Sequence, residues 1–168
     1  MLPALLLLGV GGVRADAVED AQRLMRAGQA QQALDLAERT IAAQPRDARM
    51  RFLKGVILVE QQRKAEAEQV FVALTDDFPE LPDPYNNLAV LYAADGRLQP
   101  ALAALQTALR NDPSHRAARE NLGDVHLALA IEAWSAAASG ARGDTAALQR
   151  KLRLAREIAA PPDAGRPG

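Results

Sequence analysis

The chain has 168 residues, of which 49% are hydrophobic and 24% charged, and its formal net charge is −1. This length and composition suit one folded domain. The sequence contains no cysteine, which excludes disulfide bonds and thiolate metal sites. The near-neutral charge gives no support for nucleic-acid binding, which usually needs a basic face.

A short apolar run at residues 4–13 is the first feature along the chain, and Arg14-Ala15 follows it. Val13 and Ala15 hold the small-residue positions that a signal peptidase reads. We therefore expect residues 1–15 to be a signal peptide cleaved after Ala15, and the mature protein to be periplasmic or secreted. The run is too short to span a bilayer. Because no Lys or Arg precedes it, two alternatives stay open: a start codon further upstream, or a segment that is no signal.

Three prolines recur 34 residues apart, at Pro45, Pro79 and Pro113. A fixed period of about 20 to 50 residues is typical of a solenoid, a stack of repeated units with no single global core. Two further positions of the period hold only small residues, namely Ala21, Gly55, Ala89, Ala33, Ala67 and Ala101. Small side chains are needed where two helices cross closely. Each period therefore predicts a helical hairpin.

The bend of each hairpin falls at a third position of the period, which holds Gly28, Gln62 and Gly96. Glycine can adopt the left-handed conformation that ends a helix. Proline then follows the second helix, which it cannot continue. The three hairpins are expected at residues 14–47, 48–81 and 82–115. The helices after the prolines are expected to start at the capping residues Asp47, Asp83 and Ser114.

The fourth period begins like the others and then departs from them. Trp134 and Ala137 come about seven residues too early for a normal second helix, and seven residues make about two helical turns. We therefore expect one long helix over residues 115–138, a degenerate fourth unit of about 116–139, in place of a hairpin. Ser139-Gly140 would end this helix.

A last amphipathic helix is expected over residues 144–159, with Asp144 as its cap. Its packing side is expected to consist of Leu148, Leu152, Leu154, Ala155 and Ile158. Such a helix would cover the open end of the solenoid domain, residues 16–159. Residues 160–168 have no apolar periodicity and are expected to be disordered.

The third unit carries the most specific motif in the chain. It reads Tyr85-x-x-Leu88-Ala89-x-x-Tyr92, then Gly96, Ala101-x-x-x-Leu105, Ala108 and Asp112-Pro113. This pattern resembles the tetratricopeptide repeat family, and the resemblance covers about residues 16–128. The second unit departs further, with Arg51 and Lys54 where an aromatic residue and a leucine are usual. The resemblance implies an all-α, right-handed α-solenoid of about three hairpins, which the long helix and the capping helix follow.

Two segments, Pro84–Tyr92 and Glu120–Asp124, also resemble small exported tetratricopeptide proteins of Gram-negative bacteria. That resemblance implies a periplasmic adaptor in envelope assembly. In a stack of this kind the first helix of every pair lines the concave side, where a protein or peptide partner binds. The groove is expected to consist of Arg49, Phe52, Leu53, Val56, Glu60, Asp83, Asn86, Asn87, Val90, Glu120, Asn121 and Asp124.

Asn87 and Asn121 lie one period apart in this expected groove. An asparagine side chain can hydrogen-bond a peptide backbone through both its carbonyl and its amide, although asparagine is also simply common there in the family. Glu120 and Asp124 lie beside Asn121 and would repel a carboxylate ligand. The mixed groove favours an amphipathic helix or a mixed extended segment.

Catalytic chemistry has little support in the sequence. His115 is interpreted as a surface residue at a helix start and His126 as a helix-packing residue. The sequence has no glycine-rich phosphate loop and no nucleophile elbow. We therefore expect no enzyme activity, no cofactor or metal, no nucleic-acid partner and no membrane span. The alternative to a scaffold is a self-assembling structural protein, a weak homo-oligomer formed through the altered final helices.

Overall fold

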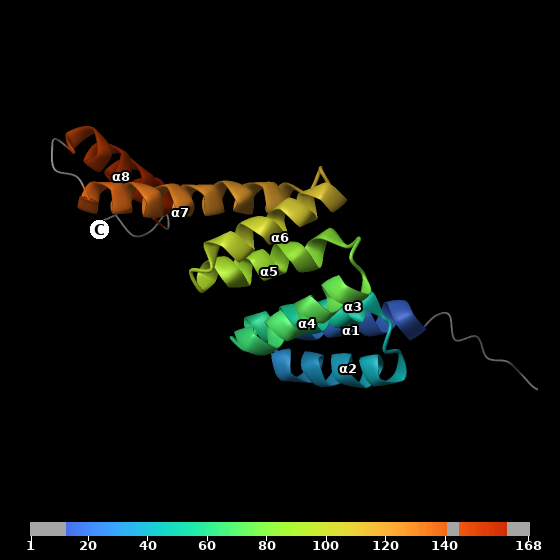
Figure 1. Cartoon of the computed structure of the whole chain (residues 1–168). Helices are drawn as coiled ribbons and strands as arrows, with labels where there is room; N and C mark the ends of the chain where they lie inside the picture. The colour runs from blue at the N-terminus through green and yellow to red at the C-terminus, as the bar shows by residue number, and fades with distance from the viewer. Residues whose placement is uncertain (1–12, 141–144, 161–168) are drawn as a thin grey trace, which may run out of the picture. The chain divides into compact units, whose positions relative to one another are not determined.

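The computed structural model describes residues 13–140 and 145–160, which form eight helices joined by short turns and contain no strand (Figure 1). The expected all-α fold is confirmed. Residues 1–12 of the expected signal peptide, the Asp144 cap and residues 161–168 of the expected tail lie outside the described residues. The cleavage site after Ala15 falls in the first turn of the first helix of the uncleaved chain, and cleavage stays a prediction.

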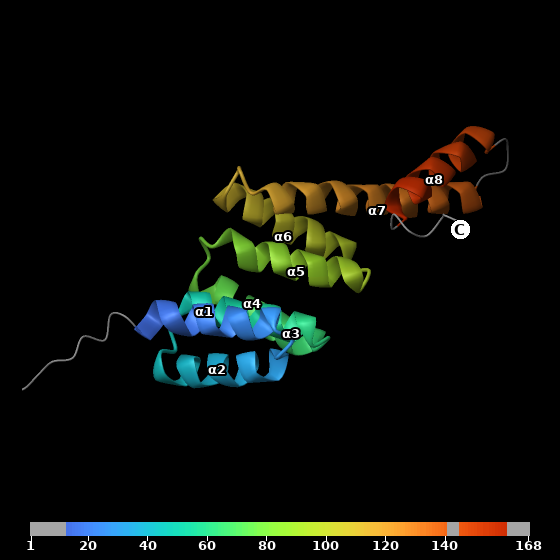
Figure 2. The ribbon, with the colours of Figure 1, turned by 180° about the vertical axis from the view of Figure 1, so that it is seen from behind.

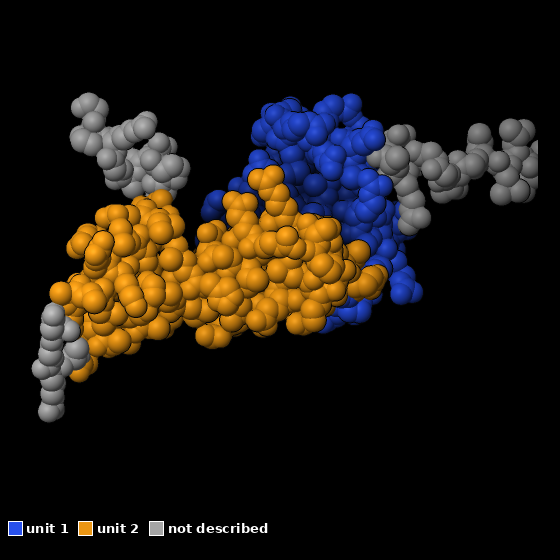
Figure 3. Space-filling view, turned by 90° about the horizontal axis from the view of Figure 1, so that it is seen from above, with its two compact units in different colours: residues 1–79 blue, residues 80–168 orange. Residues whose placement is uncertain are grey.

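The chain divides into two compact units, Met1–Pro79 and Glu80–Gly168, which Figure 3 colours separately. The first unit contains α1 (Val13–Arg26), α2 (Ala30–Ala43), α3 (Ala48–Glu60) and α4 (Lys64–Asp77). Helix α1 packs on α2 and α3 packs on α4, so each pair is a helical hairpin. Helix α3 also contacts both α1 and α2, which places the first helices of the two hairpins side by side (Figure 2).

The second unit contains α5 (Pro82–Ala94), α6 (Leu98–Asn111), α7 (Arg116–Gly140) and α8 (Ala146–Ala159). Helices α5 and α6 form the third hairpin, and α7 contacts both of them. The expected long helix is confirmed, because α7 runs unbroken for 25 residues. Its first half joins the core of α5 and α6 through Ala118 and Val125, and its second half carries α8 (Figure 1).

The small residues of the repeat lie where the helices of a hairpin cross, as expected. The five alanines at the two small positions are at most 1% exposed: Ala21, Ala33, Ala67, Ala89 and Ala101. At Gly55 a Cβ atom would lie only 2.5 Å from the Phe71 ring of α4. Helices α3 and α4 therefore approach closely only because residue 55 has no side chain.

All three hairpin bends have the left-handed conformation. The φ angles are 71° at Gly28, 60° at Gln62 and 71° at Gly96. In each bend the next amide closes the turn over the end of the first helix, as the Gln29 N–H does by donating to the Leu24 carbonyl at 2.9 Å. This is the Schellman arrangement of helix ends. The left-handed conformation expected at Gly28 and Gly96 is confirmed, and Gln62 adopts the same conformation in the second bend.

Of the three helix caps expected after the prolines, one is confirmed and two are wrong. The Asp47 carboxylate accepts a hydrogen bond from the Met50 N–H at 3.2 Å, which caps α3. Helix α5 begins one residue before Asp83, because Pro82 takes its first position and Leu81 the cap position.

The cap of α7 is His115, because its Nδ1 accepts the Ala118 N–H at 3.1 Å. Ser114 lies one residue before this cap position, and its hydroxyl and its N–H both donate to the Asp112 carboxylate, at 2.6 and 2.8 Å. The hydrogen bonds from Ser114 hold the pKa of the Asp112 carboxyl below its ordinary value.

The last two helices correct three further expectations. His126 is exposed and does not pack, because α7 runs straight on and no second helix returns to cover that position. On α8, Leu152 and Ala155 are buried against α7, whereas Leu154 is 48% and Ile158 74% exposed. Each helical residue turns by about 100°, so residues 154 and 158 lie far around α8 from Leu152.

Candidate interaction grooves

A groove of about 430 Å³ lies between α1 and α3 in the first unit. Its lining consists of Val18, Gln22, Met25 and Arg26 from α1, and Arg49, Phe52, Leu53 and Val56 from α3. Within each helix these residues follow helical spacing, so each set lies on one face. Four of the five groove residues expected on α3 line it together, and the fifth, Glu60, is exposed and not part of the lining.

The floor of this groove is apolar, and helix α4 packs against its other side. The Phe52 ring lies 5.7 Å from the Phe71 ring of α4, and Phe71 is fully buried over Gly55. Leu53 is also buried, while Phe52 and Val56 are partly exposed. The close α3–α4 crossing thus fixes the aromatic floor, and a ligand would meet a preformed apolar surface.

The edges of the groove are basic. Arg26 and Arg49 are exposed, and neither forms an ion pair with any residue that the structure describes. The lining holds no acidic residue.

The second unit has its own groove, of about 210 Å³, where α5, α6 and α7 meet. Three expected groove residues line it, namely Val90, Asn121 and Asp124, together with apolar side chains of all three helices. Asp124 is exposed and Glu120 lies exposed one turn before it. The edge of this groove is therefore acidic.

The asparagines of the second unit are partly engaged by the fold itself. The Asn121 amide donates to the Asn86 side-chain carbonyl at 2.9 Å, which joins α7 to α5. The Asn87 amide donates to the Asp83 backbone carbonyl of its own helix at 2.9 Å. Asn87 and Asn121 hold the same position of the repeat but form different hydrogen bonds. Each retains hydrogen-bonding capacity for a ligand backbone.

Asp83 also takes part in a contact between α5 and α7. Its carboxylate Oδ1 lies 3.2 Å from the His115 Nε2 atom, whose ring also caps α7. This contact between His115 and Asp83 was not expected from the sequence. The available signal was the position of both residues just after the period's proline, where two successive first helices begin side by side.

Comparison with known proteins decides the family. A profile of the tetratricopeptide repeat matches residues 18–82 and 86–138. The chain belongs to the tetratricopeptide repeat family. Proteins built from this repeat are typically protein-interaction scaffolds, and the all-α solenoid expected from the sequence is confirmed.

Solved tetratricopeptide structures share the fold. The first domain of human RPAP3 is 18% identical, with a TM-score of 0.64 over 68% of this chain and 90% of that chain. YrrB, described as having an unusual peptide-binding site, is 27% identical, with a TM-score of 0.57 over 62% of this chain and 54% of that chain. The first domain of Spaghetti, solved with the HSP90 peptide SRMEEVD, is 17% identical, with a TM-score of 0.64 over 69% and 92% of the two chains. No curated protein sequence matches the chain.

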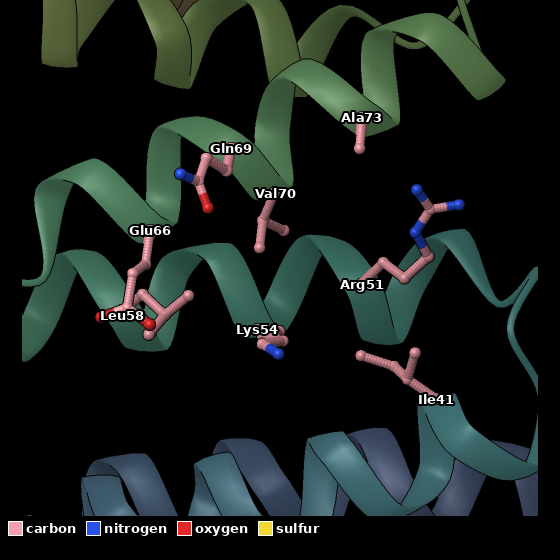
Figure 4. A pocket seen from close by; sticks show the side chains of 8 residues that line it. All are labelled: Ile41, Arg51, Lys54, Leu58, Glu66, Gln69, Val70 and Ala73. Atoms are coloured by element: carbon pink, nitrogen blue, oxygen red, sulfur yellow. The ribbon is translucent and has the colours of Figure 1, made fainter.

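The first unit of this tetratricopeptide repeat protein has a second hollow (Figure 4). It is lined by Ile41, Arg51, Lys54, Leu58, Glu66, Gln69, Val70 and Ala73. Arg51 and Lys54 replace the bulky residues usual in the family, and their cations are already bound: Arg51 to Asp77 at 2.6 Å and Lys54 to Glu38 at 2.9 Å. Glu66 is held by Arg63 at 2.7 Å, and this hydrogen bond lowers the Glu66 pKa. The charged side chains of this hollow are therefore paired with other residues of the first unit.

The described ranges contain neither a membrane-spanning helix nor a cluster of metal-ligating side chains. Between residues 13 and 140 and between 145 and 160, no helix has the length and apolar character needed to cross a bilayer. The same residues contain no cluster of three His, Asp or Glu side chains placed to hold a metal ion.

Proposed function

We propose that this chain is a scaffold that binds a peptide or helix of a cell-envelope protein, with the groove between α1 and α3 as its principal site. One observation carries the proposal: two neighbouring first helices present apolar and cationic side chains on a common groove that the fold leaves unfilled. YrrB is described as having a peptide-binding site and Spaghetti was solved with a bound peptide, which supports a ligand of this kind.

Site-specific photocrosslinking tests the groove directly. A benzophenone amino acid at residue 56, which lines the groove on α3, is expected to crosslink a defined partner in envelope extracts. The matched control is residue 72, an exposed valine on α4 outside the groove lining. Identical crosslinked products from both positions, or none from residue 56, would contradict the proposal.

Asn121, which lines the second groove, and Asn87, which lies outside its lining on α5, are proposed to contribute backbone recognition. Replacing Asn87 and Asn121 together with alanine removes the amides that remain available to a ligand. Partner capture by the double variant is expected to weaken. Unchanged capture would restrict the site to the first unit.

The periplasmic location is part of the proposal and has its own test. The apolar run at residues 4–13 and the small residues Val13 and Ala15 support a cleaved signal. Mass spectrometry of the chain exported by a Gram-negative host is expected to show a mature protein that begins at Asp16. A chain that keeps residues 1–15 in the cytoplasm would contradict the location and leave the groove proposal standing.

Self-assembly is the second candidate function, and the exposed apolar side chains of α8 favour it. Leu154 and Ile158 lie four residues apart and would form a small apolar stripe at the end of the fold. Chains could associate through this stripe. Light scattering over a range of protein concentrations separates the candidates, since a monomer at high concentration excludes assembly and a dimer sensitive to Ile158→Glu supports it.

A further inference from the structure

We infer that the groove between α1 and α3 selects an amphipathic helix whose polar flanks are acidic. This inference rests on the proposed function and names the chemistry of the ligand. It depends on the distribution of paired and unpaired cations around the groove, and on the contrast with the second unit.

Some cations of the first unit are held by the fold and others are not. Away from the groove, Arg51, Lys54 and Arg63 each lie within 3 Å of a carboxylate oxygen. Three further cations, Arg39, Arg46 and Lys64, are exposed and lie outside the groove lining. At the groove, Arg26 and Arg49 have no such partner among the described residues. An unpaired guanidinium at the edge of an apolar surface remains available to a carboxylate of a ligand.

The two arginines come from different helices, and the apolar floor belongs to both helices as well. Arg26 lies near the C-terminal end of α1 and Arg49 near the N-terminal end of α3. Between them the groove offers Phe52, Val56 and Met25 as contact surface. A ligand that covers this floor with an apolar stripe would bring residues beside the stripe to the arginines, which is the pattern of an amphipathic helix with acidic flanks.

The groove of the second unit has the opposite charge. Asp124 lines it and Glu120 lies one turn away, and neither has an ion-pair partner in the described parts of the chain. An acidic ligand would be repelled there and attracted to the first unit. Electrostatic complementarity of this kind sets partner choice more than total affinity.

Binding of three synthetic peptides to the full chain tests the inference. Each fluorescent peptide has about 18 residues, or five helical turns, with blocked ends and the same leucine stripe. The polar face carries glutamate, lysine or glutamine. Fluorescence anisotropy is expected to show the glutamate peptide binding about tenfold more tightly than the lysine peptide at low salt, since two exposed ion pairs account for about that factor. The preference should shrink at high salt.

Charge reversal of the two groove arginines is a second test, and charge reversal of Arg39 is its matched control. The double variant Arg26→Glu, Arg49→Glu is expected to lose the preference for the glutamate peptide, and Arg39→Glu, an exposed arginine of α2 outside the groove, is expected to keep it. Equal binding of the three peptides, a preference for lysine, no binding at all, or insensitivity to the double reversal would each overturn the inference. Equal binding together with partner crosslinking at residue 56 would overturn the acidic preference alone and leave the proposed function intact.

Discussion

Gly55 is the residue that sets the distance between α3 and α4. A methyl group there would lie 2.5 Å from the Phe71 ring, which is itself fully buried. We expect Gly55→Ala to lower the free energy of unfolding by about 1–3 kcal/mol, because an overpacked crossing must shift. Gly123 occupies the same position two periods later, where an added Cβ would touch nothing.

Gly123→Ala is therefore the control for the first prediction. It is expected to raise stability by up to about 1 kcal/mol, because alanine restricts the unfolded chain and favours the helix. Urea unfolding of both variants gives the comparison. Equal effects of the two substitutions would contradict the assigned helix crossing.

Gln62 has a backbone conformation that suits glycine better than glutamine. Its φ is 60°, while glycine fills the equivalent bends at residues 28 and 96. We expect Gln62→Gly to stabilise the protein by about 0.5–1 kcal/mol through relief of backbone strain. Gln69→Gly in the middle of α4 should destabilise it by about 1 kcal/mol. Thermal unfolding of both variants is the measurement, and a lower melting temperature for Gln62→Gly would contradict the turn geometry.

Asp112 gives a residue-scale prediction about pH. Hydrogen bonds from Ser114 depress the Asp112 pKa in the folded state, so they contribute stability above the ordinary aspartate pKa. That contribution is lost as the pH falls through the depressed value. We expect Ser114→Ala to raise the Asp112 pKa towards its ordinary value in an NMR titration. An unchanged titration would show that the Ser114 hydroxyl does not donate to the Asp112 carboxylate in solution.

The helices were largely predictable from the sequence, and the exceptions have physical causes. The 34-residue spacing of Pro45, Pro79 and Pro113 located the three hairpins, since proline and glycine act on the local backbone. The caps of α5 and α7 were not predicted because neighbouring residues change which residue takes the cap position. Pro82 starts α5 before Asp83, and Ser114 hydrogen-bonds to Asp112. The identity of a cap depends on which of several nearby polar groups accepts the first helical amides.

The face that α8 packs depends on its neighbour, and the sequence could not show this. Leu152 is buried against α7 while Leu154 is 48% exposed, although both belong to one apolar pattern. We expect Leu152→Ala to lower stability by about 2–5 kcal/mol and Leu154→Ala by less than about 0.5 kcal/mol.

The fluorescence of Trp134, the sole tryptophan of the chain, reports on this contact because Lys151 of α8 lies over its ring. Undocking of α8 in the Leu152 variant should shift the emission to the red, and Leu154→Ala should leave it unchanged. A similar response from both variants would place the wrong face of α8 against α7.

At the scale of the molecule, the sequence predicted only part of the lining of the two grooves. Arg49, Phe52, Leu53 and Val56 line one groove as helical spacing indicated, whereas Asn87 lines neither groove. The contribution of α1 was missed, since its part of the repeat pattern is the weakest and names no groove residue. The difference in charge between the two grooves also needed the structure, because only the ion pairs show which cations the fold has already used.

Methyl NMR of the full chain with the glutamate peptide tests the central claim most directly. Binding in the groove between α1 and α3 is expected to shift the methyl signals of Val18, Met25 and Val56. The signals of Ile41 and Val70, which line the hollow of Figure 4 on the same unit, should stay in place. Shifts at Ile41 and Val70 with none at Val18 and Val56 would contradict the claim that this groove is the binding site.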